Sequence, residues 1–445
     1  RRALSADQHD AVQRRKLPGL TLRAEAVRAY PEPGFGGHLL GFVGYAGDLR
    51  RGQYGLEGYY EPQLAGTPGS LRSAKDARGQ LVAVAGQVGR QPVDGASLVL
   101  TVDRTAQFAA CEQIRWGVER FDAVGGSILV MDPHSGAILA MCSTPDFDPE
   151  RYGSAELETF NNPVITEAYE PGSIFKVITM AAGVDLGLVT PASTYEDTGE
   201  VKIIGSKSIR NSDLKAHGAQ TMTQVLEKSL NTGAVYVATL VGKERFRQYV
   251  TAFGFGAPTG VTLAGESAGN ARALEKRGII YTLTASFGQG ITVTPLQYLA
   301  AFSAVVNGGV LVTPYVVEAV VAADGTTRKT APQVVRQVIS ARTSATISGM
   351  LVSAVDGVYD HKAKVAGYRV GGKTGTAQIA DPKGGYGSDV DHTFVGFAPA
   401  DDPKFVILVK LAKPTAVKHA ADSTTVVFSR LAEFLLHYYQ VPPNG

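Results

Sequence analysis

The sequence YEPGSIFKVITMAAGVDLGL, residues 169–188, joins a proline-glycine turn to a long apolar run. Proline is favoured at the start of a helix, and the run from Ile174 to Leu188 is apolar enough for a buried one. We therefore predict a helix that begins close to Ser173. Residues three apart share one face of a helix, so the amine of Lys176 would reach the hydroxyl of Ser173. Free backbone N–H groups at the helix N-terminus would favour negative charge developing there.

This pairing has a chemical meaning. A serine hydroxyl is a poor nucleophile until a base removes its proton. A lysine can be that base when burial and a second cation lower its pKa. Lys373 is a candidate for the second cation. Three short motifs then follow in order along the chain: SIFK at 173–176, SLN at 229–231 and KTG at 373–375.

Two similar patterns predict no chemistry. Ser212 and Lys215 repeat the serine-lysine spacing, but they lie in a polar stretch that favours a surface loop. GYRVGGKT at 367–374 matches the phosphate-binding pattern GxxxxGK[ST], which needs a helix directly after it. Gly375 follows at once, and the segment 382–385 contains a proline and two glycines, so we exclude a nucleotide-binding loop.

Strand patterns lie at both ends of a mostly helical middle section. Apolar runs at 127–131 and 137–141 flank a turn and predict a hairpin, and further strands are predicted at 393–397 and 405–409. The section from about 156 to 306 is predicted to be mostly helical. The hairpin and the late strands would join across this helical insertion. The pattern indicates an α/β or α+β architecture with a mixed sheet.

Further elements flank this sheet. A strand is predicted at 98–102, and Asp103 would cap the helix that follows it. A last helix would stop before Pro442. Residues 1 to about 95 are rich in Gly, Pro, Arg and Tyr and predict short strands and loops. The apolar positions of the two helices are Phe108, Cys111, Ile114, Val118 and Phe121 in the first, and Phe428, Leu431, Leu435 and Tyr438 in the last.

Composition limits the function classes. The 445 residues carry 43 Lys and Arg against 41 Asp and Glu, a net charge of +2 that gives no electrostatic reason to expect nucleic acid. The only cysteines, Cys111 and Cys142, favour two buried thiols, with a single disulfide as the alternative. No HExxH or zinc spacing occurs, so we predict no metal and no cofactor. No run of about eighteen apolar residues occurs, and Arg1 at the start fits a chain that lacks an N-terminal anchor.

The sequence around these motifs resembles one family. YEPGSIFK at 169–176 resembles the active-site signature of class B penicillin-binding proteins. FGQGITVTPLQ at 287–297 and GKTGTAQ at 372–378 resemble that family's FGQG and KTGT segments. GLEGYYE at 55–61 and RAYP at 28–31 are similar to motifs of its N-terminal pedestal. The resemblance covers essentially the whole chain.

This resemblance implies a fold and a domain division. We expect the serine penicillin-recognising transpeptidase fold, a mainly antiparallel sheet flanked by helices. Residues 1–95 would form a small, β-rich, non-catalytic pedestal, and residues 96–445 the transpeptidase domain. Ile174 stands where threonine is usual in the family, and Leu230 is apolar within the second motif. These departures affect the expected preference for substrates and drugs rather than the reaction.

The resemblance also implies roles. The protein would be a peptidoglycan D,D-transpeptidase that forms an acyl-enzyme with D-Ala-D-Ala stem peptides, passes it to an amine of a neighbouring stem peptide, and is inhibited by β-lactams. Backbone N–H groups of Ser173 and Thr376 would form the oxyanion hole. The expected catalytic residues are Ser173 as nucleophile, Lys176 as base, Ser229 as proton relay, Asn231 as the group that positions Lys176 and substrate, and Lys373; Thr374, Gly375 and Thr376 would bind substrate.

The expected setting is the outer face of the cell membrane, where the protein would be held by an anchor that this chain does not contain. Expected partners are a SEDS-type glycosyltransferase and other division proteins. The YEPGS form and HLLGFVG at 38–44 favour septal over elongation-type wall synthesis. Alternatives are a β-lactamase or a non-catalytic β-lactam sensor or scaffold. A long-lived penicillin adduct would separate a transpeptidase from a β-lactamase.

Overall fold

The computed structural model describes residues 4–22, 27–32, 34–47, 49–72, 87–203, 208–358, 362–380 and 385–445. The chain divides into two compact units, residues 1–33 and residues 34–445. The first unit carries helix α1 (Ala6–Arg14), which begins with a capping box between Ser5 and Gln8. All other elements named below belong to the second unit.

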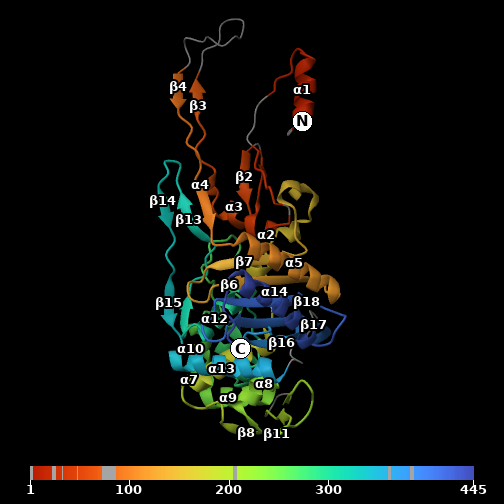
Figure 1. The fold of residues 1–445 in the computed structure, drawn as a ribbon, viewed down its shortest axis with the longest axis vertical. Coiled ribbons are helices and arrows are strands. Elements are labelled where there is room, and N and C mark those ends of the chain that lie inside the picture. Colours follow the sequence, from red (N-terminus) through yellow and green to blue (C-terminus); the bar gives the residue numbers. More distant parts are fainter. Residues whose placement is uncertain are drawn as a thin grey trace. The chain divides into compact units, whose positions relative to one another are not determined.

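A five-stranded antiparallel sheet forms the centre of the second unit (Figure 1). Its order is β16-β17-β18-β6-β7, so the last strands of the chain join the first hairpin through the pairing of β18 with β6. This confirms the predicted joining across the helical insertion and the mainly antiparallel sheet with helices that the family resemblance implies. The mixed sheet predicted from the strand pattern is wrong, because all pairings in this sheet are antiparallel. The strands are β6 (Gly125–Met131), β7 (Ile138–Thr144), β16 (Gly371–Ala380), β17 (Tyr386–Ala398) and β18 (Phe405–Ala412).

Successive side chains of a strand point to opposite faces of a sheet, and both faces of this sheet are buried. Ile128 and Val130 belong to one hydrophobic cluster, together with α5 (Arg104–Arg120) and α14 (Thr424–Tyr438). Leu129 and Met131 belong to the other cluster, together with α7 (Lys176–Asp185), α12 (Pro295–Val306) and α13 (Ala341–Gly357). The helix α7 that follows Ser173 is therefore fixed against the centre of the molecule.

Three predicted details differ from the structure. Asp103 caps α5 as predicted, but Phe108 is 63% exposed, and the buried face of the helix contains small residues such as Ala106 and Ala110. Tyr438 is likewise 42% exposed. The strand predicted at 98–102 is β5 (Ser97–Leu100), which pairs with β13 (Val317–Val321) in a separate sheet. Packing against neighbours, which the sequence does not contain, decides these positions.

Helices and short strand pairs fill the section between β7 and β16. The helices are α6 (Pro163–Thr166), α8 (Met222–Glu227), α9 (Asn231–Val241), α10 (Lys243–Ala252) and α11 (Ile280–Ala285), with short 3₁₀ turns η2 (Pro149–Ser154), η3 (Leu157–Phe160), η4 (Gly172–Phe175) and η5 (Arg272–Glu275). The strands are β8 (Thr194–Asp197), β9 (Glu200–Val201), β10 (Ile209–Arg210), β11 (Gly218–Thr221), β12 (Val310–Val312), β14 (Thr327–Lys329) and β15 (Val334–Gln337). The 3₁₀ turn η7 (Ala420–Asp422) precedes α14.

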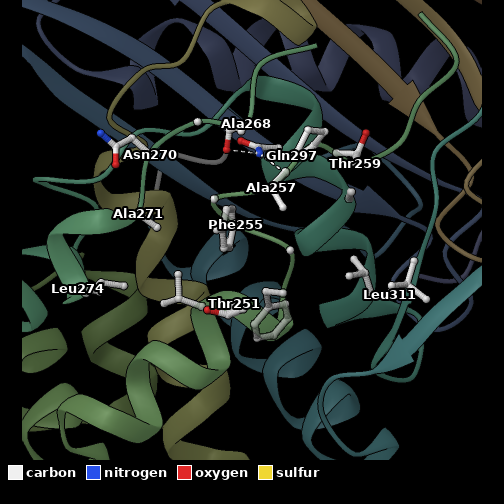
Figure 2. A pocket seen from close by; sticks show the side chains of 18 of the residues that line it. Thr251, Phe255, Ala257, Thr259, Ala268, Asn270, Ala271, Leu274, Gln297 and Leu311 are labelled. Carbon is white, nitrogen blue, oxygen red and sulfur yellow. Dashed lines mark hydrogen bonds between the residues drawn. The ribbon is translucent and has the colours of Figure 1, made fainter.

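A cavity of about 660 Å³ opens between α10, α12 and the loop that follows α10 (Figure 2). Gln297 joins two loops at the edge of this cavity. Its side-chain amide donates to Ala257 O at 2.6 Å and to Ala268 O at 2.8 Å. Phe255 lines this cavity and its ring lies 5.0 Å from that of Phe175. None of the residues expected to be catalytic or to bind substrate lines it.

The part of the second unit before β5 mixes short helices and strands. It contains α2 (Gly37–Leu40), β1 (Phe42–Ala46), β2 (Leu49–Gln53), α3 (Gly55–Tyr59), α4 (Glu61–Leu64), β3 (Ser70–Arg72) and β4 (Gln87–Arg90). The prediction of small strands and loops omitted these three helices, each of which is only four or five residues long. The pedestal boundary at residue 95 stays a prediction.

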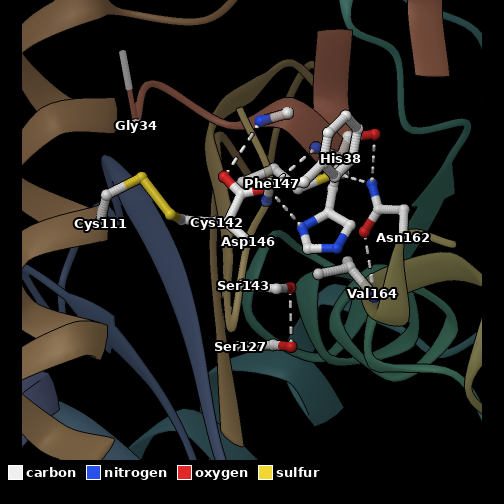
Figure 3. Close-up of polar contacts among 12 residues, drawn as sticks. Gly34, His38, Cys111, Ser127, Cys142, Ser143, Asp146, Phe147, Asn162 and Val164 are labelled. Atoms are coloured by element: carbon white, nitrogen blue, oxygen red, sulfur yellow. Dashed lines mark hydrogen bonds and ion pairs between the residues drawn. A yellow bond between two sulfur atoms is a disulfide. The ribbon is translucent and has the colours of Figure 1, made fainter. Parts of the chain in front are cut away.

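The segment at Gly37 is held by hydrogen bonds to Asp146, which follows β7, and a disulfide lies nearby (Figure 3). The carboxylate of Asp146 accepts from the backbone N–H groups of Gly37 at 3.0 Å and His38 at 3.3 Å, and His38 Nδ1 lies 3.0 Å from Asp146 Oδ1. Cys111 on α5 and Cys142 on β7 form a disulfide, with their Cα atoms 5.3 Å apart. The interpretation that favoured free thiols is therefore wrong, because packing of α5 on β7 brings together two residues that are 31 positions apart.

Candidate active site

The turn that carries Ser173 is tighter than predicted. Residues 172–175 form the 3₁₀ turn η4, and the α-helix begins only at Lys176. In a 3₁₀ turn, side chains three residues apart eclipse one another. Lys176 Nζ accordingly donates to Ser173 Oγ at 3.0 Å. The predicted contact between nucleophile and base is therefore present, although the helix starts later than the sequence indicates.

Lys176 is placed in an environment that favours its neutral form. It is 1% exposed, and burial, followed by the positive charge of Lys373, holds its pKa well below the usual value. Its amine donates to the backbone oxygen of Ser229 at 2.5 Å and to Ser229 Oγ at 3.2 Å. A neutral amine can accept a proton from Ser173, which is what general-base activation requires.

Ser229, the first residue of the second motif, contacts the amine of Lys176 and has an uncommon backbone conformation. Ser229 has a φ of 57°, a left-handed conformation that is uncommon for residues other than glycine. It stands two residues before α9 begins, and this conformation accompanies the double contact with Lys176. Asn231 is placed differently from the expectation: its amide donates to Arg210 O at 2.7 Å, and no hydrogen bond joins it to Lys176 among the described residues.

The third motif lies in β16, the edge strand of the sheet next to η4. A strand at this position excludes the nucleotide-binding loop. Lys373 is fully buried, and its amine donates to Thr374 O at 3.2 Å. A Cβ on Gly375 would lie 3.1 Å from Pro171 O, so the strand approaches the nucleophile turn closely. Thr376 Oγ1 accepts from Ala420 N at 3.2 Å, which ties the strand to η7.

A turn from the FGQG segment holds the residues before Ser173, a function that the sequence analysis did not identify. Gly172 N donates to Gly288 O at 3.1 Å, and Tyr169 and Val293 exchange backbone hydrogen bonds at 3.0 and 2.9 Å. Gly288 has a φ of +83°, and a Cβ there would lie 2.2 Å from Gly172 O. A glycine at position 288 is consistent with such a close backbone approach, but the sequence does not show that Gly172 is the residue it approaches.

A pocket of about 1300 Å³ opens over these three motifs. Lys176 and Lys373 are buried and do not line it. One wall is the segment 414–421 after β18. Ser212 reaches the rim, but both it and Lys215 are exposed and no hydrogen bond joins them among the described residues. The expected site residues that line the pocket are Ser173, Ser229, Asn231, Thr374 and Thr376, and two further lining residues are Glu170 and Tyr386.

This arrangement fits acyl transfer: a serine with a neutral lysine beside it, at the base of a pocket bounded by an edge strand. In the part of the chain that the structure describes, no group of three or more His, Cys, Asp and Glu side chains is placed to hold a metal ion. Within the same ranges, no helix has the length and apolar character needed to cross a membrane.

Comparison with known protein families finds two matching domains. Residues 126–433 match the penicillin binding protein transpeptidase domain. Residues 1–100 match the penicillin-binding protein dimerisation domain. The three motif segments all fall within the first match.

Known relatives cover almost the whole chain. The chain is 38% identical over 421 residues to Stage V sporulation protein D of Bacillus subtilis, covering 93% of this chain and 64% of that protein. The chain thus spans about two thirds of the length of that relative. It is 28% identical over 445 residues to the peptidoglycan D,D-transpeptidase FtsI of Escherichia coli, covering all of this chain and 73% of that protein.

A solved structure agrees with the fold. The crystal structure of penicillin binding protein 3 from Mycobacterium tuberculosis, complexed with ampicillin, superposes with a TM-score of 0.84 at 31% identity. The match covers 94% of this chain and 90% of that chain.

Proposed function

Because this chain belongs to the class B penicillin-binding proteins, we propose that it is a peptidoglycan D,D-transpeptidase that cross-links stem peptides. One observation carries this proposal: Lys176 Nζ lies 3.0 Å from Ser173 Oγ in an environment that lowers the lysine pKa. A serine activated in this way attacks carbonyl carbons. The edge strand with Lys373 and the threonines supplies the charge and hydrogen bonds that a C-terminal carboxylate needs.

The first chemical step is acylation. Ser173 Oγ attacks the carbonyl carbon between the two terminal D-alanines while its proton passes to Lys176. The peptide C–N bond breaks, the departing D-alanine takes up a proton relayed through Ser229, and an ester on Ser173 remains. The carboxylate of the departing residue binds Thr374 and Thr376, which line the pocket, and the positive charge of the buried Lys373 attracts it. Gly375 lets β16 lie close to the turn that carries Ser173.

The second step is aminolysis. The neutral amine of a neighbouring stem peptide attacks the ester carbonyl and gives up a proton to Lys176. The ester C–O bond then breaks, and Ser173 Oγ takes that proton back. A new amide joins the two peptides. β-Lactams imitate D-Ala-D-Ala, so the same serine would be acylated and then deacylate slowly.

The experiment that tests this function combines two measurements. Intact-mass spectrometry after benzylpenicillin should give one adduct that lasts for minutes or longer. A donor stem peptide supplied with an amine acceptor should release D-alanine and form the cross-linked product. Rapid hydrolysis of penicillin would support a β-lactamase instead, and an adduct without any D-alanine release would support a sensor.

We also propose septal wall synthesis as the cellular role, at the outer face of the membrane, with an anchor and a SEDS-type glycosyltransferase as partner. The YEPGS and HLLGFVG segments and the similarity to FtsI support the septal role. Depletion in cells tests it: division filaments are expected, whereas rounded cells would indicate elongation. Normal vegetative growth with a defect only in spores would also contradict the proposal.

A further inference from the structure

The active-site pocket is lined by two carboxylates that the proposed chemistry does not use, and one of them, Glu170, lies next to the Ser173 segment. Glu170 stands three residues before Ser173 and lines the same pocket. Its Oε1 accepts from Gly290 N at 2.9 Å, and its Oε2 accepts from the hydroxyl of Tyr386 at 2.9 Å. Gly290 belongs to the turn that holds the nucleophile segment, and Tyr386 begins β17. Both oxygens are therefore held in place from two sides.

Neither of these partners is charged. No lysine or arginine pairs with Glu170 among the residues that the structure describes, whereas Arg210 at the same pocket lies 3.2 Å from the carboxylate of Glu200. Burial raises the pKa of Glu170, opposed by its two hydrogen bonds. A half-buried carboxylate without a cation is costly, and a cationic ligand group would relieve that cost. The site is therefore built to receive a positive charge.

A second acidic residue at the pocket serves as a comparison. Glu227 also lines it, but its Oε1 accepts from Ser353 Oγ at 2.6 Å on α13. Within the described ranges, no hydrogen bond or ion pair joins Glu227 to the turn that holds Ser173. Glu170 is the acidic group tied to that turn, so a cation bound to it would lie in the part of the pocket where the acyl-enzyme forms.

We propose that Glu170 is a specificity-determining residue that binds the ammonium group of the acceptor stem peptide and brings it to the acyl-enzyme. This inference rests on the proposed transpeptidase function and names the group of the acceptor that the site selects. The bound ammonium loses one proton to solvent before its nitrogen attacks the ester. Tyr386 and Gly290 position the carboxylate and do not themselves meet the acceptor's charge.

Steady-state aminolysis tests this binding. The acyl-enzyme is formed from an N-acyl-D-alanyl thioester, and the acceptor is either a cationic amine such as D-lysine or hydroxylamine, which is uncharged at neutral pH. For Glu170→Gln we expect the KM for the cationic amine to rise about tenfold, since a charge-assisted contact is lost. The kcat, the KM for hydroxylamine and the rate of penicillin acylation should stay within about twofold.

Two further variants separate recognition from architecture. Tyr386→Phe removes the hydroxyl that reaches Glu170 but keeps the carboxylate, so it should retain most of the preference for the cationic amine. Glu275→Gln removes an exposed carboxylate outside this pocket and controls for net charge. If Glu170→Gln and Tyr386→Phe impaired both acceptors alike, Glu170 would be only a tether for β17, and the proposal would be wrong.

The donor peptide is the other possible source of a positive charge. To test this source, the acylation rate is measured with a donor thioester that carries an ammonium side chain and with the acetylated, uncharged form of the same donor. Loss of acylation by the cationic donor in Glu170→Gln, with unchanged acceptor KM, would assign the carboxylate to the donor and overturn the proposal. Unaltered penicillin acylation in the same variant would leave the transpeptidase function itself intact.

A measurement on the unaltered protein covers the case in which Glu170→Gln does not fold. Salt screens an attraction between a half-exposed carboxylate and an ammonium group. The KM for the cationic amine should therefore rise with ionic strength, while that for hydroxylamine stays constant. Equal salt dependence for the two acceptors would contradict the proposal.

Discussion

Gly288 and Gly172 lie in direct backbone contact: Gly172 N donates to Gly288 O at 3.1 Å, and a Cβ on Gly288 would lie 2.2 Å from Gly172 O. The residue after Gly172 is Ser173. The position of Ser173 therefore depends on a glycine that is more than one hundred residues away in the chain.

Gly288→Ala is expected to destabilise the protein by about 3 kcal/mol or more, because a left-handed residue with a side chain is strained and the new methyl group meets backbone atoms. Displacement of Ser173 should slow penicillin acylation at least about tenfold. Gly325→Ala is the matched control, since its φ is +84° and nothing lies within 4 Å of an added Cβ. Thermal melts and acylation rates for both variants make the comparison. Equal effects of the two substitutions would show that strain alone, without the contact to Gly172, explains the loss.

Ser173 should carry the penicilloyl group. Ser173→Ala is expected to abolish labelling while changing stability by no more than about 1 kcal/mol, because a half-buried hydroxyl is removed and its partner Lys176 keeps its contacts with Ser229. Intact-mass spectrometry and peptide mapping check the adduct, and thermal melts check folding. An adduct mapped to Ser212 or Ser229 would overturn the assignment.

Lys373 should control the protonation of Lys176. Its charge lowers the pKa of Lys176, so Lys373→Ala should raise that pKa, and a higher pH would be needed to obtain the neutral base. Acylation at neutral pH should fall about 100-fold or more, because the attraction of this charge for the substrate carboxylate is also lost. The acidic limb of the pH–rate profile should move to higher pH. Lys373→Met keeps most of the volume and should behave alike, and an unchanged rate at every pH would refute this role.

The chemistry of the site followed from local sequence, whereas its architecture did not. The spacing of Ser173 and Lys176 predicts their contact in any helical turn, and the apolar run in β6 predicts a strand. Both properties depend on neighbours along the chain. The tertiary contacts of these elements do not: the contacts of Gly172 with Gly288 and of Glu170 with Tyr386 join segments that only the folded chain brings together.

The missed details have the same origin. Phe108 fits the apolar spacing of α5, yet the helix packs through Ala106 and Ala110, because small side chains allow it to lie close to the sheet. Cys111 and Cys142 carry no spacing signal, and their pairing follows from the packing of α5 on β7. The proposed recognition of the acceptor's ammonium group by Glu170 could not be predicted from the sequence, because it depends on the hydrogen-bond partners of that carboxylate.

The disulfide should contribute to stability without serving catalysis. Cross-linking residues 31 positions apart stabilises by about 3–4 kcal/mol through the unfolded chain. The double variant Cys111→Ala, Cys142→Ala should therefore unfold at lower urea concentration, and it should acylate at the normal rate because β7 lies at the opposite edge of the sheet from β16. Reductant should lower the urea midpoint of unfolding of the unaltered protein and leave the urea midpoint of the double variant unchanged. Two titratable thiols in the untreated protein would contradict the pairing.

The adjacent tyrosines at the end of α3 should separate folding from partner binding. Tyr59 is 45% exposed, whereas Tyr60 is only 8% exposed and belongs to the hydrophobic core, so the two cannot be treated alike as docking residues. Tyr60→Ala should cost about 3 kcal/mol or more, as expected for a buried aromatic side chain. Tyr59→Ala should leave the melting temperature and penicillin acylation nearly unchanged, since an exposed residue contributes little to stability.

We propose that residues 1–95 act as a docking and spacing element without chemistry of their own, and on this proposal Tyr59→Ala should nevertheless impair wall synthesis in cells. The measurement compares the acylation rate of the purified chain with complementation of a depletion strain, with thermal melts to establish that the variant is folded. Tyr45→Ala offers a second position on the neighbouring strand β1 at which the same separation can be sought. A folded Tyr59→Ala protein that lost acylation as completely as Ser173→Ala would show that this segment belongs to the active site, because a docking surface can be altered without changing the chemistry at Ser173.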